Sequence, residues 1–206
     1  MSRVARVTVE TVVKVGGGVL SRAGAFELVT GALAAFGRGR RVLVVPGGGP
    51  FEQAVRELLR RLKIGVDAAH WMAALGMDQY AHALVERTTG AVLVEQPPEI
   101  EAALDAGSIP VLAPYRWLRT VDPLPHTWDA SSDNVAAWIA GVVGARRIVL
   151  IKAAMGDQPK ALDPAYLRAL PAGMDSVVLT PNELEKLGDA LAQSPIPQQR
   201  RTVREG

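Results

Sequence analysis

One short stretch, residues 42–50 with the sequence Val-Leu-Val-Val-Pro-Gly-Gly-Gly-Pro, constrains the fold more than any other part of the chain. Its four apolar residues, three of them β-branched, predict a short buried strand. Pro50 then opens a predicted helix, where its missing N–H has no cost. A strand that enters a helix through glycines directs free N–H groups and the positive end of the helix dipole outward. The turn of Gly47, Gly48 and Gly49 is therefore a predicted phosphate site. A tight turn without a ligand is the alternative.

A second glycine turn, made of Gly16, Gly17 and Gly18, follows a predicted strand at 8–15. Lys14 stands near the end of that strand among valines, and burying an unpaired ammonium group is costly. We therefore expect Lys14 to face a ligand, with a surface lysine as the alternative. Neither turn has the sequence of a Walker loop or of a dinucleotide fingerprint. Two glycine turns and one lysine predict a site for two phosphate groups and for the charge that moves between them.

Strands and helices alternate along the whole sequence, and most predicted strands are continuous apolar runs. This pattern is typical of an α/β protein, a three-layer αβα sandwich with a mainly parallel central sheet. The predicted strands are 8–15, 41–45, 91–95, 108–113, 147–151 and 176–179. The predicted helices are 23–36, 50–62, 67–87, 98–105, 132–143, 165–170 and 181–192, with a long loop at 114–129. Ligands of such sheets bind beyond the carboxyl ends of the strands, where both glycine turns fall.

Composition narrows the classes of function. The 206 residues fit one domain, which we expect at 1–193 with a tail at 194–206. The absence of cysteine excludes disulfides and thiolate chemistry, and the three histidines show no metal-binding spacing, so no metal site is predicted. A net charge of +2 gives no reason to expect nucleic acid, and no apolar run has the length of a membrane span. No signal peptide is visible, so a cytoplasmic protein is expected.

Several charged residues are candidates for the chemistry. Asp133 lies in the first turn of a predicted apolar helix, where it either orients Lys14 or only complements the helix dipole. Asp129 is a second candidate of this kind and, with Asp78, a candidate for substrate binding. Lys152 and Lys160 flank an irregular segment after a strand. One of them is a candidate for a second cation that binds phosphates, and the alternative for each is a solvated surface lysine. Four arginines, which the sequence does not rank, are candidates for an acceptor phosphate: Arg56, Arg60, Arg116 and Arg119.

Three segments together resemble the amino acid kinase superfamily, which includes acetylglutamate, aspartate and bacterial uridylate kinases. They are Val-Lys-Val-Gly-Gly at 13–17, Val-Pro-Gly-Gly-Gly at 45–49 and Ser-Asp-Asn-Val-Ala-Ala at 132–137. The resemblance implies a largely parallel eight-stranded sheet, Mg²⁺-ATP as phosphoryl donor, a small-molecule acceptor and a homo-oligomer. It also implies that Lys14 contacts the transferred group, that Gly16 and Gly17 face the nucleotide, that Gly48 and Gly49 hold the acceptor, and that Asp133 orients the lysines.

Within the superfamily, segments 70–80 and 127–133 look closest to a small branch, similar to the aminomethylfuran phosphate kinase of methanofuran biosynthesis. That enzyme makes a diphosphate from a furan monophosphate. A kinase of a nucleoside monophosphate or of an amino acid carboxylate is an alternative. A ribokinase-like enzyme is disfavoured, because only a tail follows its motif at 180–183.

The chain departs from the family at the segment that follows strand 147–151. Many members have a Thr-Asp pair there, near the nucleoside, whereas this chain has Lys152 and Ala153, followed by Gly156 and Asp157. The resemblance assigns this segment, with Lys160, to nucleotide binding. Two interpretations stay open: Lys152 has taken over a phosphate contact, or the chain is a non-catalytic sensor of a nucleotide or metabolite.

Overall fold

Six parallel strands form one sheet in the structure, a computed structural model that describes residues 9–127, 131–153 and 164–192. The strands are β1 Thr11–Val15, β2 Val42–Pro46, β3 Ala91–Val94, β4 Ile109–Leu112, β5 Arg147–Ile151 and β6 Asp175–Leu179. Their order across the sheet is β3-β4-β2-β1-β5-β6, and every pairing is parallel. The predicted α/β class with a parallel sheet is confirmed, and the described residues supply six of the eight strands that the resemblance implies.

Helices connect the strands, as crossovers between parallel strands require. They are η1 Gly17–Val19, α1 Ala25–Gly37, α2 Gly49–Leu62, α3 Val66–Arg87, α4 Pro97–Asp105, α5 Tyr115–Val121, α6 Ser132–Val142, α7 Pro164–Ala169, η2 Pro181–Lys186 and α8 Leu187–Ala192. None of these described helices has both the length and the apolar composition that crossing a membrane requires.

Two predictions about helices were wrong. Residues 115–121, predicted as part of a long loop, form α5. The single helix predicted at 181–192 is instead a 3₁₀ helix, η2, followed directly by α8, and Glu183 within η2 has the non-helical angles φ −124° and ψ 17°. The side chain of Glu183 accepts the backbone N–H of Thr180 at 3.1 Å in the capping box that the sequence predicted.

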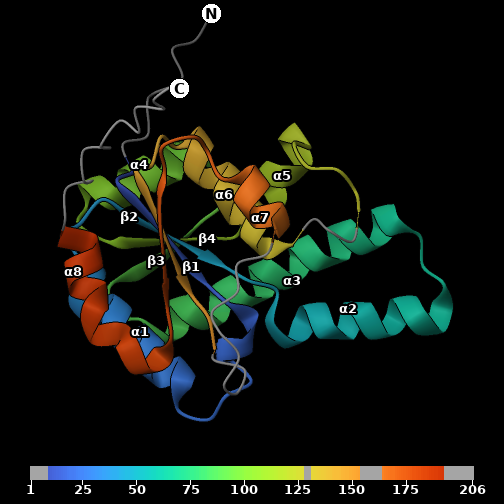
Figure 1. Cartoon of the computed structure of the whole chain (residues 1–206), viewed down its shortest axis with the longest axis horizontal. Coiled ribbons are helices and arrows are strands. Elements are labelled where there is room, and N and C mark those ends of the chain that lie inside the picture. The colour runs from blue at the N-terminus through green and yellow to red at the C-terminus, as the bar shows by residue number, and fades with distance from the viewer. Residues whose placement is uncertain (1–8, 128–130, 154–163, 193–206) are drawn as a thin grey trace, which may run out of the picture.

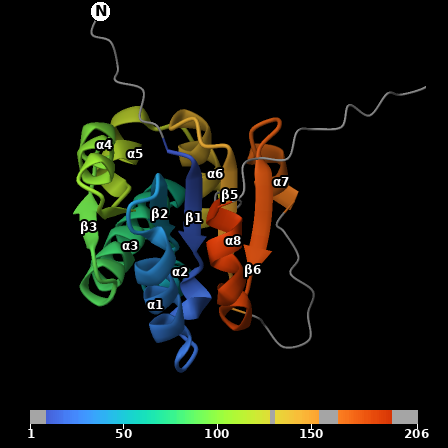
Figure 2. The same cartoon turned by 90° about the vertical axis from the view of Figure 1, so that its left-hand side faces the viewer.

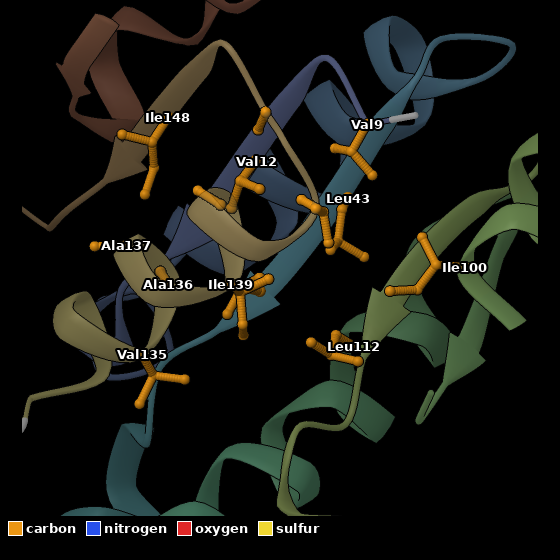
Figure 3. Close-up of a cluster of buried hydrophobic side chains, with 14 of the residues drawn as sticks. Val9, Val12, Leu43, Ile100, Leu112, Val135, Ala136, Ala137, Ile139 and Ile148 are labelled. Atoms are coloured by element: carbon orange, nitrogen blue, oxygen red, sulfur yellow. The ribbon is translucent and has the colours of Figure 1, made fainter. Parts of the chain in front are cut away.

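The sheet is covered on both faces (Figures 1 and 2). Successive strand residues point to opposite faces, so Val12 packs against α6 while Val13 packs against α1. Figure 3 shows the first face, where Val12, Leu43 and Ile148 of the strands meet Val135 and Ile139 of α6. The helices α4, α5, α6 and α7 lie on this side, and α1, α8 and much of α3 lie on the other. Continuous apolar strands are the consequence of this double burial.

The order of the strands determines where a ligand is expected. The chain runs from β1 to β2 on one side and later places β5 on the other side of β1. The crevice at such a reversal, beyond the carboxyl ends of the strands, is the usual ligand site of open α/β sheets. At the same edge, α2 and α3 pack against each other and extend away from the sheet (Figure 1).

Part of the sequence prediction lies outside the described residues. The proposed tail at 194–206 and four candidate site residues belong to this part: Asp129, Gly156, Asp157 and Lys160. For them the sequence predictions stay predictions.

Candidate active site

Lys14, Asp133 and Lys152 meet at the carboxyl edge of the central strands. Lys14 shares the sheet face of Val12 and so points toward α6, whose first turn contains Asp133. The Nζ of Lys14 lies 2.5 Å from Oδ1 of Asp133, and the Nζ of Lys152 lies 2.7 Å from Oδ2. One carboxylate therefore bridges two ammonium groups that come from β1 and from the end of β5.

This ion-pair cluster is largely buried. The side chains of Lys14 and Asp133 are only 5% and 9% exposed, and that of Lys152 is 28% exposed. Burial alone would raise the pKa of Asp133, but the two ammonium groups outweigh it and hold that pKa below its ordinary value. Two cations and one carboxylate leave a net charge of +1 at the strand ends. Such a preorganised positive charge suits a group that carries negative charge in a transition state.

The two glycine turns lie directly against each other beside this cluster. The N–H of Gly16 donates to the carbonyl of Ile151 at 2.7 Å, and the N–H of Gly47 donates to the carbonyl of Val15 at 2.8 Å. A Cβ on Gly17 would lie 2.4 Å from the nitrogen of Gly49, and a Cβ on Gly47 would lie 2.8 Å from the nitrogen of Gly17. The close approach of the two backbones therefore requires glycine at both positions.

Both turns keep backbone donors available. The N–H groups of Gly17, Gly18, Gly48 and Gly49 have no acceptor among the residues that the structure describes. Those of Gly48 and Gly49 stand at the N-terminus of α2, a helix of 14 residues. Free N–H groups at a helix start bind anions readily. Both turns thus offer free N–H donors next to Lys14, and phosphate binding at them stays a prediction.

A pocket that is partly open to solvent lies between α2, α3 and α6, next to the turn at Gly47–Gly49. Ser132, which precedes Asp133, lines it beside Gly47. Its walls are mostly apolar, formed by Val55, Leu59, Val66, Ala69, Ala73, Ala74, Met77, Leu118 and Val135. Its polar lining residues are Glu52, Arg56, His70, Thr127 and Ser132. The sequence did not predict this lining, because residues far apart in the chain form it.

Glu52 and Arg56 form a charged pair within the pocket. The Nε and one terminal nitrogen of Arg56 lie 3.1 Å and 2.5 Å from Oε1 of Glu52. Glu52 also lies against the N-terminal turn of α2, where a Cβ on Gly48 would meet it at 2.4 Å. The pocket therefore offers one anionic and one cationic side chain between apolar walls.

The structure ranks the four candidate arginines, since Arg56 alone among them lines the pocket. Arg60 pairs with Glu57, and Arg116 pairs with Glu95. Arg119 lies over the ring of Trp71, with 4.4 Å between its guanidinium carbon and the ring centroid. Arg56 is thus the candidate best placed for an acceptor phosphate.

Asp78 holds two helices together. Its Oδ1 accepts the backbone N–H of Tyr115 at 3.0 Å and so fixes the start of α5 against α3. Burial raises the pKa of Asp78 to about 6, although the hydrogen bond from Tyr115 opposes the shift. Asp78 is absent from the lining of the pocket described above. Its predicted contact with substrate stays a prediction, and its observed contact is structural.

The comparisons with known proteins agree with this geometry. The chain matches the amino acid kinase family over residues 10–156. It is 23% identical over 112 residues to a curated relative, [5-(aminomethyl)furan-3-yl]methyl phosphate kinase of Methanocaldococcus jannaschii. That alignment covers 54% of this chain and 51% of the relative, so the chain spans about half the length of the protein it matches.

Solved structures show the same fold. The uridylate kinase of Archaeoglobus fulgidus superposes with a TM-score of 0.65 at 14% identity, over 88% of this chain and 96% of that one. The UMP kinase of Ureaplasma parvum superposes with a TM-score of 0.64 at 14% sequence identity, over 88% of this chain and 95% of that one. At such low identity these likenesses concern the fold, whereas the family match extends over most of the chain and includes Lys14, both glycine turns and Asp133. The chain belongs to the amino acid kinase family.

Proposed function

We propose that this protein is an ATP-dependent kinase that phosphorylates a small acceptor bound in the pocket between α2, α3 and α6. The observation that carries the proposal is the Lys14–Asp133–Lys152 cluster between two turns with free N–H groups. Phosphoryl transfer depends mainly on positioning and on charge stabilisation, and these groups supply both. Membership of the amino acid kinase family and the name of the curated relative support the same reaction.

In the proposed reaction an oxygen of the acceptor phosphate attacks the γ-phosphorus of ATP. The bond between that phosphorus and the β–γ bridging oxygen breaks, and ADP leaves with the bond's electron pair. Lys14 stabilises the negative charge on the transferred group, and Lys152 stabilises the donor phosphates. Asp133 holds both ammonium groups in place. The turn at Gly16–Gly18 faces the donor, and the turn at Gly47–Gly49 faces the acceptor.

Mg²⁺ fits this site as a companion of the nucleotide. Bound Mg²⁺ neutralises phosphate charge and usually takes few ligands from the protein. Asp133 already contacts two ammonium groups, so the phosphates of the nucleotide are better ligands for Mg²⁺ than this carboxylate is. We assign no protein residue to the metal.

The pocket supports an acceptor like that of the curated relative. An aminomethylfuran methyl phosphate combines an ammonium group, an apolar ring and a phosphate. Glu52 complements the ammonium group, Arg56 the phosphate, and the apolar walls the ring. A nucleoside monophosphate has no ammonium group, so Glu52 would offer it no matching charge.

The test is ADP release by the purified protein with Mg²⁺-ATP and three classes of acceptor. These are [5-(aminomethyl)furan-3-yl]methyl phosphate, uridine monophosphate and small amino acid carboxylates. We expect turnover that depends on the furan phosphate, with a diphosphate as product. Glu52→Gln should raise KM for the furan phosphate, whereas Glu57→Gln, on an exposed pair of the same helix, should not. Turnover with uridine monophosphate alone would reject the furan acceptor but keep the kinase.

Two outcomes would reject the kinase itself. Tight ATP binding without turnover on any acceptor would favour the sensor that the departure at Lys152 left open. Absence of ATP binding would show that the nucleotide assignment is wrong. The homo-oligomer implied by the family is a separate proposal, which analytical ultracentrifugation of the purified chain tests.

A further inference from the structure

Two of the three histidines, far apart in the sequence, meet at the rim of the pocket. His70 belongs to α3, and His126 follows α5, whose C-terminal cap is Asp122. Their rings stack with centroids 4.2 Å apart and an interplanar angle of 21°. Ligand atoms of His70, Asp122 and His126 all lie within 4.8 Å of one another. The chain separation of these residues explains why their spacing in the sequence gave no sign of a cluster.

The two nitrogens of His126 face different carboxylates. Nε2 lies 2.9 Å from Oδ1 of Asp122, within the cluster, and Nδ1 lies 2.7 Å from Oδ1 of Asp67. Asp67 thus fixes the ring of His126 from the far side. A carboxylate on the second nitrogen is the usual partner of a histidine that binds a metal with the first, because it sets the ring orientation and the tautomer.

We propose that His70, Asp122 and His126 bind a divalent transition-metal cation of the Zn²⁺ class, with Asp67 as the positioning residue of His126. Two imidazoles and one carboxylate form a ligand set that zinc accepts, with bonds of about 2.0–2.2 Å. Around such an ion, ligand atoms lie about 3.5 Å apart, so modest side-chain rotations close the cluster. Mg²⁺ prefers oxygen ligands, so this site is distinct from the metal that accompanies a nucleotide.

The ion would join two walls of the pocket. His70 lines the pocket, as does Thr127, which follows His126. An ion at this point cross-links α3 to the segment after α5. Three protein ligands leave a fourth coordination position for water or another ligand. The proposal concerns binding of the ion and is independent of the kinase reaction.

The experiment is Zn²⁺ titration by calorimetry on the full chain, without a polyhistidine tag and without nucleotide. The sequence contains three histidines and no cysteine, so competing sites are few. We expect one Zn²⁺ per chain, and affinity lowered more than about 100-fold by His70→Ala, His126→Ala or Asp122→Asn. Asp67→Asn should lower it about 10–100-fold. His82→Ala, on the exposed side of the same α3 helix, is the matched control and should bind as the wild type does.

Co²⁺ supplies a second measurement, since a tetrahedral Co²⁺ complex absorbs in the visible and should lose this absorption in Asp122→Asn. Circular dichroism of the metal-free variants establishes that each is folded. Asp122→Asn replaces an exposed carboxylate and keeps the test open if a histidine variant unfolds. Failure of the folded wild type to bind Zn²⁺ would overturn the proposal, as would equal loss of affinity in His82→Ala. His126 would then serve only as a bridge between Asp67 and Asp122.

Discussion

The cluster around Lys14 and the pocket beside it are built in different ways. Buried side chains at the ends of β1 and β5 and two turns in backbone contact form the cluster. The pocket lies largely between helices, and its charged pair is more open, with the side chain of Arg56 50% exposed and that of Glu52 25% exposed. The cluster is therefore constrained from several directions, whereas residues of the pocket can change without disturbing the sheet. In the proposed function, the type of reaction depends on the first region and the choice of acceptor on the second.

The largest effect expected from this comparison is that of Lys14→Ala. The substitution removes the cation that we assign to the transferred phosphoryl group, so kcat should fall about 10²–10³-fold. Steady-state ADP release measures this fall in kcat. A nearly unchanged KM for the acceptor would show that the cluster and the pocket act separately. Lys186→Ala, at a 58% exposed lysine paired with Glu183, is the matched control and should keep full activity. Unchanged kcat in folded Lys14→Ala would remove Lys14 from the mechanism.

The next effect tests the contact between the turns. A Cβ at Gly17 meets the backbone of Gly49 at 2.4 Å, so Gly17→Ala should cost about 1–3 kcal/mol of unfolding free energy. Gly31→Ala, inside α1 with nothing within 4 Å of the added Cβ, should instead stabilise by about 0.5–1 kcal/mol. Urea denaturation of both variants gives the comparison. Equal unfolding free energies of the two variants would mean that the two turns can move apart at little cost. That result would contradict a rigid cluster.

Arg56→Gln should affect the pocket and leave the cluster unchanged. Loss of the guanidinium group should raise KM for a phosphorylated acceptor about tenfold, since a hydrogen bond to a charged group contributes about 1.5–3 kcal/mol and solvent reduces it here. We expect kcat to stay near its original value. Arg60→Gln, on the same helix with a 76% exposed side chain, is the control. A fall in kcat with unchanged KM would place Arg56 with the cluster instead.

The sequence predicted the sheet edge well because local patterns specify it. The strand predicted at 147–151 has the observed bounds of β5, and the run of apolar residues there follows from burial on both faces. Local patterns also made candidates of the two glycine turns, of Lys14 at a strand end and of Asp133 in the first turn of a helix, and the resemblance then implied their roles. The structure adds that Lys152 contacts the same carboxylate as Lys14, at 2.7 Å.

The sequence predicted the helical region less well, because contacts between distant residues determine it. Helix α5 stands between prolines, which favoured a loop, yet the carboxylate of Asp78 accepts the first N–H of that helix. The pairing of residues around the pocket, such as His70 with His126, likewise arises only when α3 and α5 pack together. The spacing of residues along the chain does not predict such contacts.

The smallest predicted effect compares two aspartates, one from each region. Asp133 meets two ammonium groups, so its pKa is lowered and its stabilising effect is lost only as pH falls below about 4. Asp78 meets one backbone N–H, and burial raises its pKa to about 6. Between about pH 4 and 6 the folded chain therefore binds more protons at Asp78 than the unfolded chain does. This site consequently makes stability fall as pH rises through that range.

Asp78→Asn should abolish this dependence, because the amide oxygen still accepts the N–H of Tyr115 and carries no charge. The unfolding free energy of the variant, taken relative to that of the wild type, should rise by about 1 kcal/mol or less from pH 5 to pH 7.5. Urea denaturation at both values measures the gain, with Asp189→Asn at an exposed carboxylate as control. A variant that loses stability as pH rises would mean that the charge of Asp78 stabilises the start of α5. The joint between α3 and α5 would then depend on a charged contact, as the Lys14 cluster does, and the contrast between the regions would fail.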